Sequence, residues 1–177
     1  MRTALHLCVL ALATGFVTDA ATLEQLSMDQ MTDKATSIVR ATVAGSYANV
    51  INSTVYTHYT LRTSESLKGG MVTEVMMPGG VAGNLRQTFP GVPELKTGRE
   101  YLLFVWRSST GITHLLGLSQ GVFEVTQQAD GSTVASRGKI GEMMLDARGN
   151  KVADRAVSIG VADLRARLHS KPGIAVK

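Results

Sequence analysis

The fold is decided by a run of six apolar residues, Tyr101-Leu102-Leu103-Phe104-Val105-Trp106. Successive side chains of a β-strand point to opposite faces of its sheet, so a strand that is apolar throughout must be covered on both faces. The run therefore predicts a central strand. Phe104 and Trp106 share one face of that strand, and we expect both to be core residues.

Shorter β-rich segments lie on both sides of this run and are separated by turns. Residues 55–62 alternate between apolar and polar side chains, which is typical of a half-buried strand. Further strands are expected at residues 38–44, 72–77, 85–89, 112–118, 122–126 and 133–136. Turns are expected at Asn49–Asn52, Pro78-Gly79-Gly80 and Asp130-Gly131. Short strands without long alternating helices predict a mainly β fold, either a small antiparallel barrel or a sandwich.

A short helix is expected before these strands and another after them. Ser27 and Gln30 have the spacing of a capping box for a helix over residues 27–34. Near the C-terminus, Ser158 is expected to cap a second helix. The inner face of that helix is expected to carry Val161, Leu164 and Leu168.

The first 20 residues have the organisation of a signal peptide. Arg2 precedes an uncharged apolar stretch over residues 4–17, and small residues lead to an expected cleavage after Ala20. The stretch is short for a membrane span of about 20 residues, and the alternative is a buried N-terminal helix. The sole cysteine, Cys8, would leave with the leader. A cysteine-free mature chain predicts export to a bacterial periplasm or medium, and no later segment is apolar enough to span a membrane.

The mature chain is expected to consist of a β-domain over residues 21–145 and a basic C-terminal segment with one short helix over residues 146–177. Residues 21–147 hold 10 Lys/Arg and 11 Asp/Glu, whereas residues 148–177 hold 7 Lys/Arg and 2 Asp. The basic segment is either a contact for an anionic lipid or cell-surface polymer, or a solvated helix face and tail. Nucleic acid is not an expected partner, because this segment has no aromatic residue for base stacking.

The sharpest catalytic motif is Gly117-Leu118-Ser119-Gln120-Gly121, which matches the G-x-S-x-G nucleophile elbow of α/β-hydrolases. Asp163 and His169 follow in the order of a hydrolase triad. The elbow requires a strand before the serine and a helix after it, whereas strand-like sequence stands on both sides here. The favoured interpretation is therefore a glycine-flanked bend between two strands.

No metal or cofactor site is expected. His58 and His114 each lie in an expected strand, and two histidines without acidic residues at a suitable spacing make a poor metal site. We expect both side chains to face solvent. The glycine-rich residues 78–83 lack the Gly-Lys-Ser/Thr ending of a phosphate loop.

Five phrases occur in order along the middle of the chain: Ser66-Leu67-Lys68-Gly69, Pro78-Gly79-Gly80, Gly91-Val92-Pro93, Gly98-Arg99-Glu100-Tyr101-Leu102-Leu103-Phe104 and Gly117-Leu118-Ser119-Gln120-Gly121-Val122-Phe123. This order resembles a group of exported bacterial β-rich proteins of unknown function. The resemblance implies export and a small β-barrel similar to oligomer-binding-fold or protease-inhibitor barrels. It implies no known activity. Inhibitor barrels usually rely on an N-terminal cysteine, which the mature chain lacks.

These features favour an exported, non-enzymatic binding or accessory domain of the bacterial envelope. Its contacts are expected from two loops at the rim of the β-domain, residues 78–83 and 90–95. The expected partner is an unidentified protein or an anionic cell-surface polymer, and no oligomeric state is specified. The alternatives are a small serine hydrolase built on Ser119 and a barrel that holds a small apolar ligand in its interior.

Overall fold

The computed structural model describes residues 22–170, so the expected signal peptide and residues 171–177 lie outside the described part. In chain order the elements are β1 (Thr22–Glu24), α1 (Met28–Lys34), β2 (Ser37–Ile51), β3 (Thr54–Lys68), β4 (Glu74–Pro78), β5 (Gly80–Ala82), β6 (Leu85–Gln87), β7 (Glu100–Arg107), β8 (Thr113–Leu115), the 3₁₀-helix η1 (Leu118–Gly121), β9 (Val122–Gln127), β10 (Thr133–Arg137), β11 (Met143–Leu145), β12 (Lys151–Val152), β13 (Val157–Gly160) and α2 (Val161–Ser170). The predicted mainly β class, with a short helix on each side of the main strands, is confirmed.

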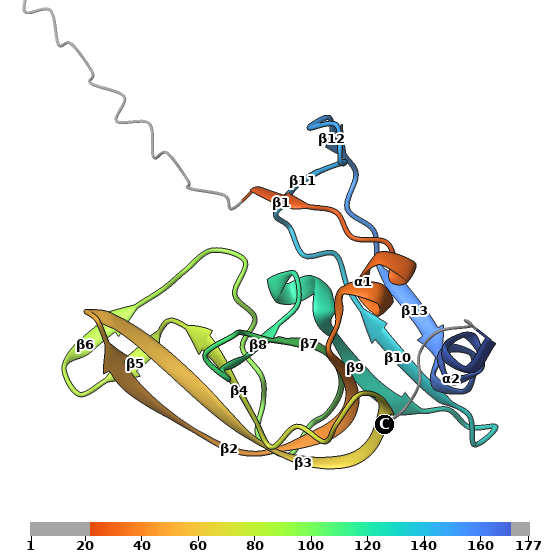
Figure 1. The fold of residues 1–177 in the computed structure, drawn as a ribbon, viewed down its shortest axis with the longest axis horizontal. Coiled ribbons are helices and arrows are strands. Elements are labelled where there is room, and N and C mark those ends of the chain that lie inside the picture. Colours follow the sequence, from red (N-terminus) through yellow and green to blue (C-terminus); the bar gives the residue numbers. More distant parts are fainter. Residues whose placement is uncertain (1–21, 171–177) are drawn as a thin grey trace, which may run out of the picture.

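Eight strands form one antiparallel sheet in the order β13-β10-β9-β7-β2-β3-β4, and β8 pairs with β7. The order ends at β13 and β4, so within residues 22–170 the sheet is open and sandwich-like and does not close into a barrel. Two smaller sheets, β1-β11-β12 and β5-β6, flank it. Figure 1 shows β5, β6 and the end of the β2–β3 hairpin at one end of the molecule and both helices toward the other, with β2 and β3 running between them. None of the helices in the described chain has the length and apolar character needed to cross a membrane.

Strand β7 is central, as predicted, and it separates two hydrophobic clusters. It pairs with β2 on one side and with β9 on the other. Tyr101, Leu103 and Val105 belong to a cluster with residues of β2, β3 and β4. Leu102 and Phe104 belong to a second cluster with α1, α2 and β9. Both faces of β7 are therefore buried, which accounts for its unbroken apolar sequence.

The first helix forms where the capping box predicts it. Ser27 Oγ accepts a hydrogen bond from the Gln30 N–H at 3.1 Å, and Gln30 Oε1 accepts one from the Ser27 N–H at 2.8 Å. These two bonds satisfy backbone donors that the first helical turn leaves unpaired. Leu26 and Met31, which flank the cap, are both buried in the second cluster.

Three local predictions are wrong. Trp106 is 40% exposed because it lies at the end of β7, where its ring stacks on His114 with 5.0 Å between centroids. Strand β2 runs on to Ile51, and the turn is made by Asn52 and Ser53, whose positive φ angles of 48° and 66° suit a two-residue hairpin. Ser158 lies in β13 instead of capping α2, because it pairs with β10. The expected inner face of α2 is confirmed: Val161, Leu164 and Leu168 are buried.

We predict that Phe104→Ala and Trp106→Ala differ sharply in stability. Phe104 is fully buried, so its truncation should lower the free energy of unfolding by about 3–5 kcal/mol. Trp106→Ala should cost roughly 1 kcal/mol or less, because much of that side chain already contacts water. Urea unfolding of both variants measures the difference, and equal costs would contradict the burial of Phe104 and the exposure of Trp106.

Candidate functional site

A cleft of about 370 Å³ opens at the end of the molecule where β5 and β6 lie beside the β2–β3 hairpin (Figure 1). Both loops singled out in the sequence contribute to its lining, through residues 78–81 on one side and residues 92–94 on the other. Side chains of β2, β3 and β4 complete the lining with Ser46, Thr57, Tyr59 and Met77. Two loops that lie before and after the β5–β6 hairpin thus meet at one concave surface.

The first wall of the cleft is fixed to β3. The Gly79 N–H donates to the Val55 carbonyl at 2.7 Å, and the Thr57 hydroxyl donates to the Gly79 carbonyl at 2.7 Å. Gly80 has a φ of +120°, and a Cβ at this position would lie 2.1 Å from Thr57 Oγ1. Only glycine fits so close to the strand. Gly80 therefore allows this loop to pack closely against β3.

The second wall is fixed to the corner before β9 and to β7. Ser119 Oγ donates to the Gly91 carbonyl at 2.5 Å. The Lys96 N–H donates to the Tyr101 hydroxyl at 3.0 Å. These bonds hold residues 91–96 at both ends.

The floor of the cleft includes a tyrosine that is 6% exposed, Tyr59. Burial is the main cause that raises the pKa of Tyr59 above its usual value. A backbone hydrogen bond with Leu95 opposes this effect, and the negative charge of Glu94 adds to it. The phenol is therefore neutral at physiological pH and can donate or accept a hydrogen bond. Among the described residues, Arg86 and Glu94 are the only charged side chains in the lining.

The Gly117–Gly121 motif forms the corner between β8 and β9. Gly117 adopts a left-handed conformation with φ of +61°, and the 3₁₀-helix η1 that follows leads directly into β9. A nucleophile elbow leads into an α-helix at this place. A Cβ on Gly121 would lie 2.4 Å from the Leu116 carbonyl oxygen, so this glycine permits tight backbone packing. The corner has the shape of the glycine-flanked bend between strands.

The three residues of the hydrolase alternative are not brought together. Ser119 donates to a backbone carbonyl of the cleft wall. Asp163 and His169 are exposed in the first and last turns of α2. No hydrogen bond within residues 22–170 joins Ser119 to either of them. The serine therefore has a positioning role in the observed geometry and no general base beside it.

The residue of this motif that makes long-range contacts is Gln120, which the sequence reasoning missed. Its side chain is 1% exposed. Its Oε1 accepts a hydrogen bond from the Leu26 N–H at 2.8 Å, and its Nε2 donates to the Glu24 carbonyl at 2.8 Å. One amide thus fastens the N-terminal segment to the β8–β9 corner. The signal in the sequence was its place in the phrase from Gly117 to Phe123, which does not reveal a partner so distant in the sequence.

A second polar group surrounds His58, which is 8% exposed, so the expectation of a solvent-facing side chain is wrong. Its Nδ1 lies 2.9 Å from Glu74 Oε1 and its Nε2 lies 3.0 Å from Asn49 Oδ1. The Tyr47 ring stacks on the imidazole at 4.6 Å, and the Tyr47 hydroxyl donates to Glu74 Oε2 at 2.9 Å. These residues come from β2, β3 and β4, and they bury His58 by pairing across strands.

A cleft of about 440 Å³ lies beside this group and is lined by His58, Glu74 and Arg107 among others. Both ring nitrogens of His58 are already occupied within the group. Within residues 22–170 no three His, Cys, Asp or Glu side chains are grouped as a metal site would need. The contacts of His58 with Tyr47, Asn49 and Glu74 therefore connect β2, β3 and β4 and have a structural role.

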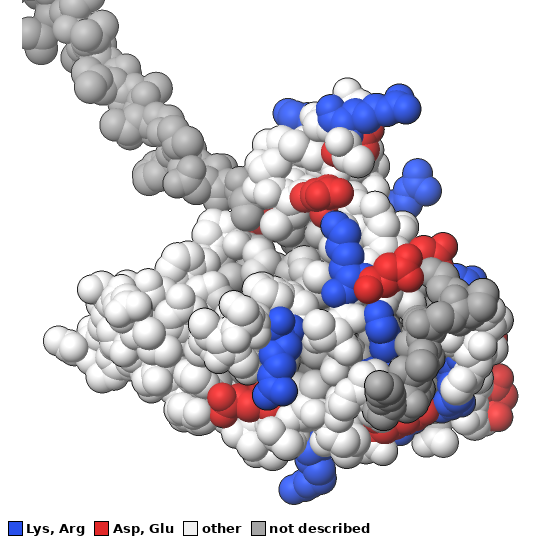
Figure 2. All heavy atoms as spheres, viewed as in Figure 1, with Lys and Arg blue, Asp and Glu red and all other residues white. Residues whose placement is uncertain are grey.

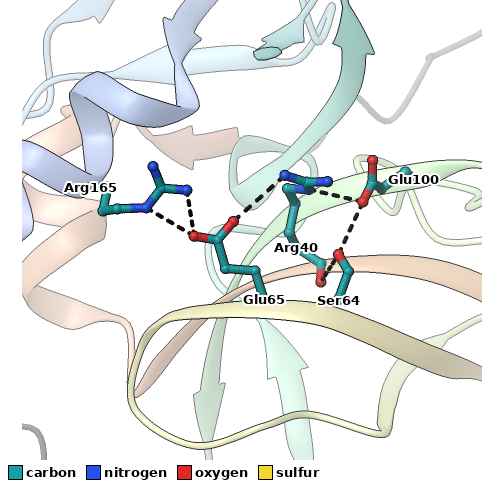
Figure 3. Close-up of polar contacts among 5 residues, drawn as sticks. All are labelled: Arg40, Ser64, Glu65, Glu100 and Arg165. Atoms are coloured by element: carbon teal, nitrogen blue, oxygen red, sulfur yellow. Dashed lines mark hydrogen bonds and ion pairs between the residues drawn. The ribbon is translucent and has the colours of Figure 1, made fainter. Parts of the chain in front are cut away.

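Two ion pairs tie the basic C-terminal segment to the sheet. Figure 3 shows the longer connection, in which Arg165 Nη2 of α2 donates to Glu65 at 2.6 Å. Glu65 also pairs with Arg40 at 3.6 Å, and Arg40 Nε donates to Glu100 at 2.9 Å. Ser64 Oγ adds a bond to Glu100 at 3.0 Å. This network of two cations and two anions has no net charge, so the positive charge of Arg165 is compensated.

The second ion pair is nearly buried. Arg137 Nη1 lies 3.6 Å from Asp154 Oδ1, and the two side chains are 7% and 9% exposed. Burial lowers the pKa of Arg137, and the charge of Asp154 opposes that effect. The Asp154 Oδ2 also accepts a hydrogen bond from the Ile140 N–H. Together with the pairing of β13 and β10, these contacts make the segment after residue 145 part of the main fold.

We predict that Gln120 matters more for stability than Ser119. Gln120→Ala leaves the buried Leu26 N–H without a partner, and it should lower the free energy of unfolding by about 1–3 kcal/mol. Ser119→Ala removes one half-buried hydrogen bond and should cost about 0.5–1.5 kcal/mol. Urea unfolding measures both values. A Gln120→Ala variant as stable as the unmodified chain would show that Gln120 does not hold the N-terminal segment in place.

Comparisons with protein-family models, curated proteins and solved structures give no match for this chain. The functional assignment therefore rests on the geometry of the molecule. That geometry offers a preformed cleft with fixed walls and, within the described residues, no assembled catalytic group.

Proposed function

We propose that the protein is an exported, non-enzymatic binding domain of the bacterial envelope, and that the cleft between residues 78–81 and 92–94 receives a segment of a partner protein. The observation that carries the proposal is the fixation of both cleft walls by hydrogen bonds to the sheet. Walls that are ordered before binding lose less conformational entropy when a ligand arrives. Export is supported by the leader-like first 20 residues.

The lining indicates what kind of segment fits. Met77, Phe89 and Val92 offer apolar surface, while Thr57 and Tyr59 offer hydroxyl groups. Such a surface suits an uncharged peptide segment that inserts an apolar side chain and makes a few hydrogen bonds. Binding of this kind should depend only weakly on salt, because few charges take part.

An anionic cell-surface polymer is the second candidate partner, and it would use a different surface. Arg148, Lys151 and Arg155 are exposed and form no ion pair within residues 22–170. Figure 2 shows basic side chains, in blue, at the end of the molecule that carries β12. Contact at this surface would weaken strongly as salt is raised.

The non-enzymatic character is supported by the engagement of Ser119. Its hydroxyl is held by the Gly91 carbonyl, and the two residues that would complete a triad lie on α2. A nucleophile needs a base within hydrogen-bond reach. The corner that carries Ser119 instead supports the wall of the cleft.

We predict that blocking the cleft abolishes capture of the partner. Tagged mature chain, residues 21–177, is incubated with envelope and medium fractions of the host in moderate salt, and captured material is identified by mass spectrometry. Ser46→Trp places a large ring in the cleft from an exposed strand position and should remove the dominant protein partner. Ser158→Trp, at an exposed position of β13, is the matched control and should capture normally.

Two outcomes would contradict this prediction. Capture that survives Ser46→Trp would show that the partner does not use the cleft. Capture that disappears in moderate salt, or with Arg148→Gln and Lys151→Gln, would assign binding to the basic surface and an anionic polymer.

A further inference from the structure

We propose that the uncharged end of the molecule inserts into the headgroup region of a phospholipid bilayer. Nine large apolar side chains are exposed within residues 22–170. Five of them lie on the β2–β3 hairpin, on the β5–β6 hairpin and just after β6. We call these five the apolar tip: Val50, Ile51, Val81, Leu85 and Phe89, each 37–49% exposed. Gathering of apolar side chains at one protruding end marks an interaction surface.

Charge is nearly absent from the segments that form the apolar tip. Residues 41–61 contain no Asp, Glu, Lys or Arg, and residues 75–93 contain only Arg86. Figure 2 shows the end with β5 and β6, on the left, as a surface without charged side chains in this view. Moving a charge from water into an apolar medium is costly, so a surface without charges can enter lipid at low cost.

The backbone of the tip is hydrogen-bonded along one edge of each strand. Strand β2 pairs with β3 up to Ile51 and Thr54, and β5 pairs with β6. The Gln87 side chain joins the two hairpins: its Oε1 accepts from the Val55 N–H at 2.7 Å, and its Nε2 donates to the Ser53 carbonyl at 2.9 Å. The open outer edges of these strands place the backbone in the hydrated headgroup region, because every backbone polar group must be satisfied in the hydrocarbon core.

These features favour lipid over a second protein as the occupant of the tip. Arg86 lies beside Leu85 on β6, is exposed, and forms no ion pair within the described residues. A guanidinium group at this place can bind a lipid phosphate while the neighbouring apolar side chains enter the acyl boundary.

The tip projects from the half of the molecule opposite the helices (Figure 1). It can therefore enter a bilayer while the charged surfaces stay in water. Val81 and Phe89 of the tip also line the cleft, whereas Val50, Ile51 and Leu85 do not. Substitutions at these last three positions therefore test the lipid inference separately from the proposed partner site. A molecule bound in this way would hold its cleft at the membrane surface.

Vesicle sedimentation tests the inference. The mature chain, residues 21–177, should sediment with phosphatidylcholine vesicles in moderate salt. Val50→Asp and Leu85→Asp should each weaken binding about tenfold or more, because a carboxylate would have to enter the interface. The control is Met71→Asp, which changes an apolar side chain that is 64% exposed on the loop between β3 and β4 and should leave binding unchanged.

Fluorescence gives a second, site-specific measurement. Trp106 is the sole tryptophan and is not part of the tip. Trp106→Phe combined with Val50→Trp places the probe on the tip, and its emission should shift to the blue with vesicles and be quenched by brominated phosphatidylcholine. The Trp106 emission of the unmodified chain should not be quenched.

Several results would overturn the inference: no sedimentation with phosphatidylcholine, binding only to vesicles that contain phosphatidylglycerol and only in low salt, or equal binding by the Asp variants. Capture of a protein that needs Val50 and Leu85 in the absence of vesicles would assign the tip to a protein interface. Ser46→Trp should bind vesicles normally, so failure of the cleft proposal and failure of the lipid proposal are distinguishable.

Discussion

The burial of β7 on both faces is the constraint on which the other features depend. Alternate side chains of this strand enter two separate hydrophobic clusters, one formed with β2, β3 and β4 and the other with the helices and β9. Each face of the sheet is therefore covered by a different part of the chain. This arrangement needs no closed barrel, and it leaves β2 and β3 free to extend past the core as a long hairpin.

The two parts of the molecule on either side of β7 have different structural roles. In the helical half, Gln120 holds the N-terminal segment, and the pairs Arg165–Glu65 and Arg137–Asp154 hold the C-terminal segment. In the other half, the loops of the cleft are fixed by short hydrogen bonds, and the hairpin ends are exposed and almost without charge. Anchoring both ends of the described chain in one half leaves the opposite end available for contacts.

Most features that local sequence determines were predicted, whereas features that depend on distant partners were missed. The apolar run of β7, the capping box of α1 and the buried face of α2 are local patterns, and all three are confirmed. The burial of His58 was missed because Glu74 and Asn49 reach it from neighbouring strands. Gln120 was missed because its partners precede it by more than ninety residues. The two loops of the cleft were identified by their turn residues, although their meeting at one surface depends on the fold.

Hydrogen–deuterium exchange of the mature chain, with and without its captured partner and phosphatidylcholine vesicles, reports on the cleft and the apolar tip together. We expect new protection at residues 46–57 and 78–94, in the cleft walls and the apolar tip, with residues 146–170 unchanged. Protection confined to residues 146–170 would contradict this expectation and would place the contact surface on the basic segment.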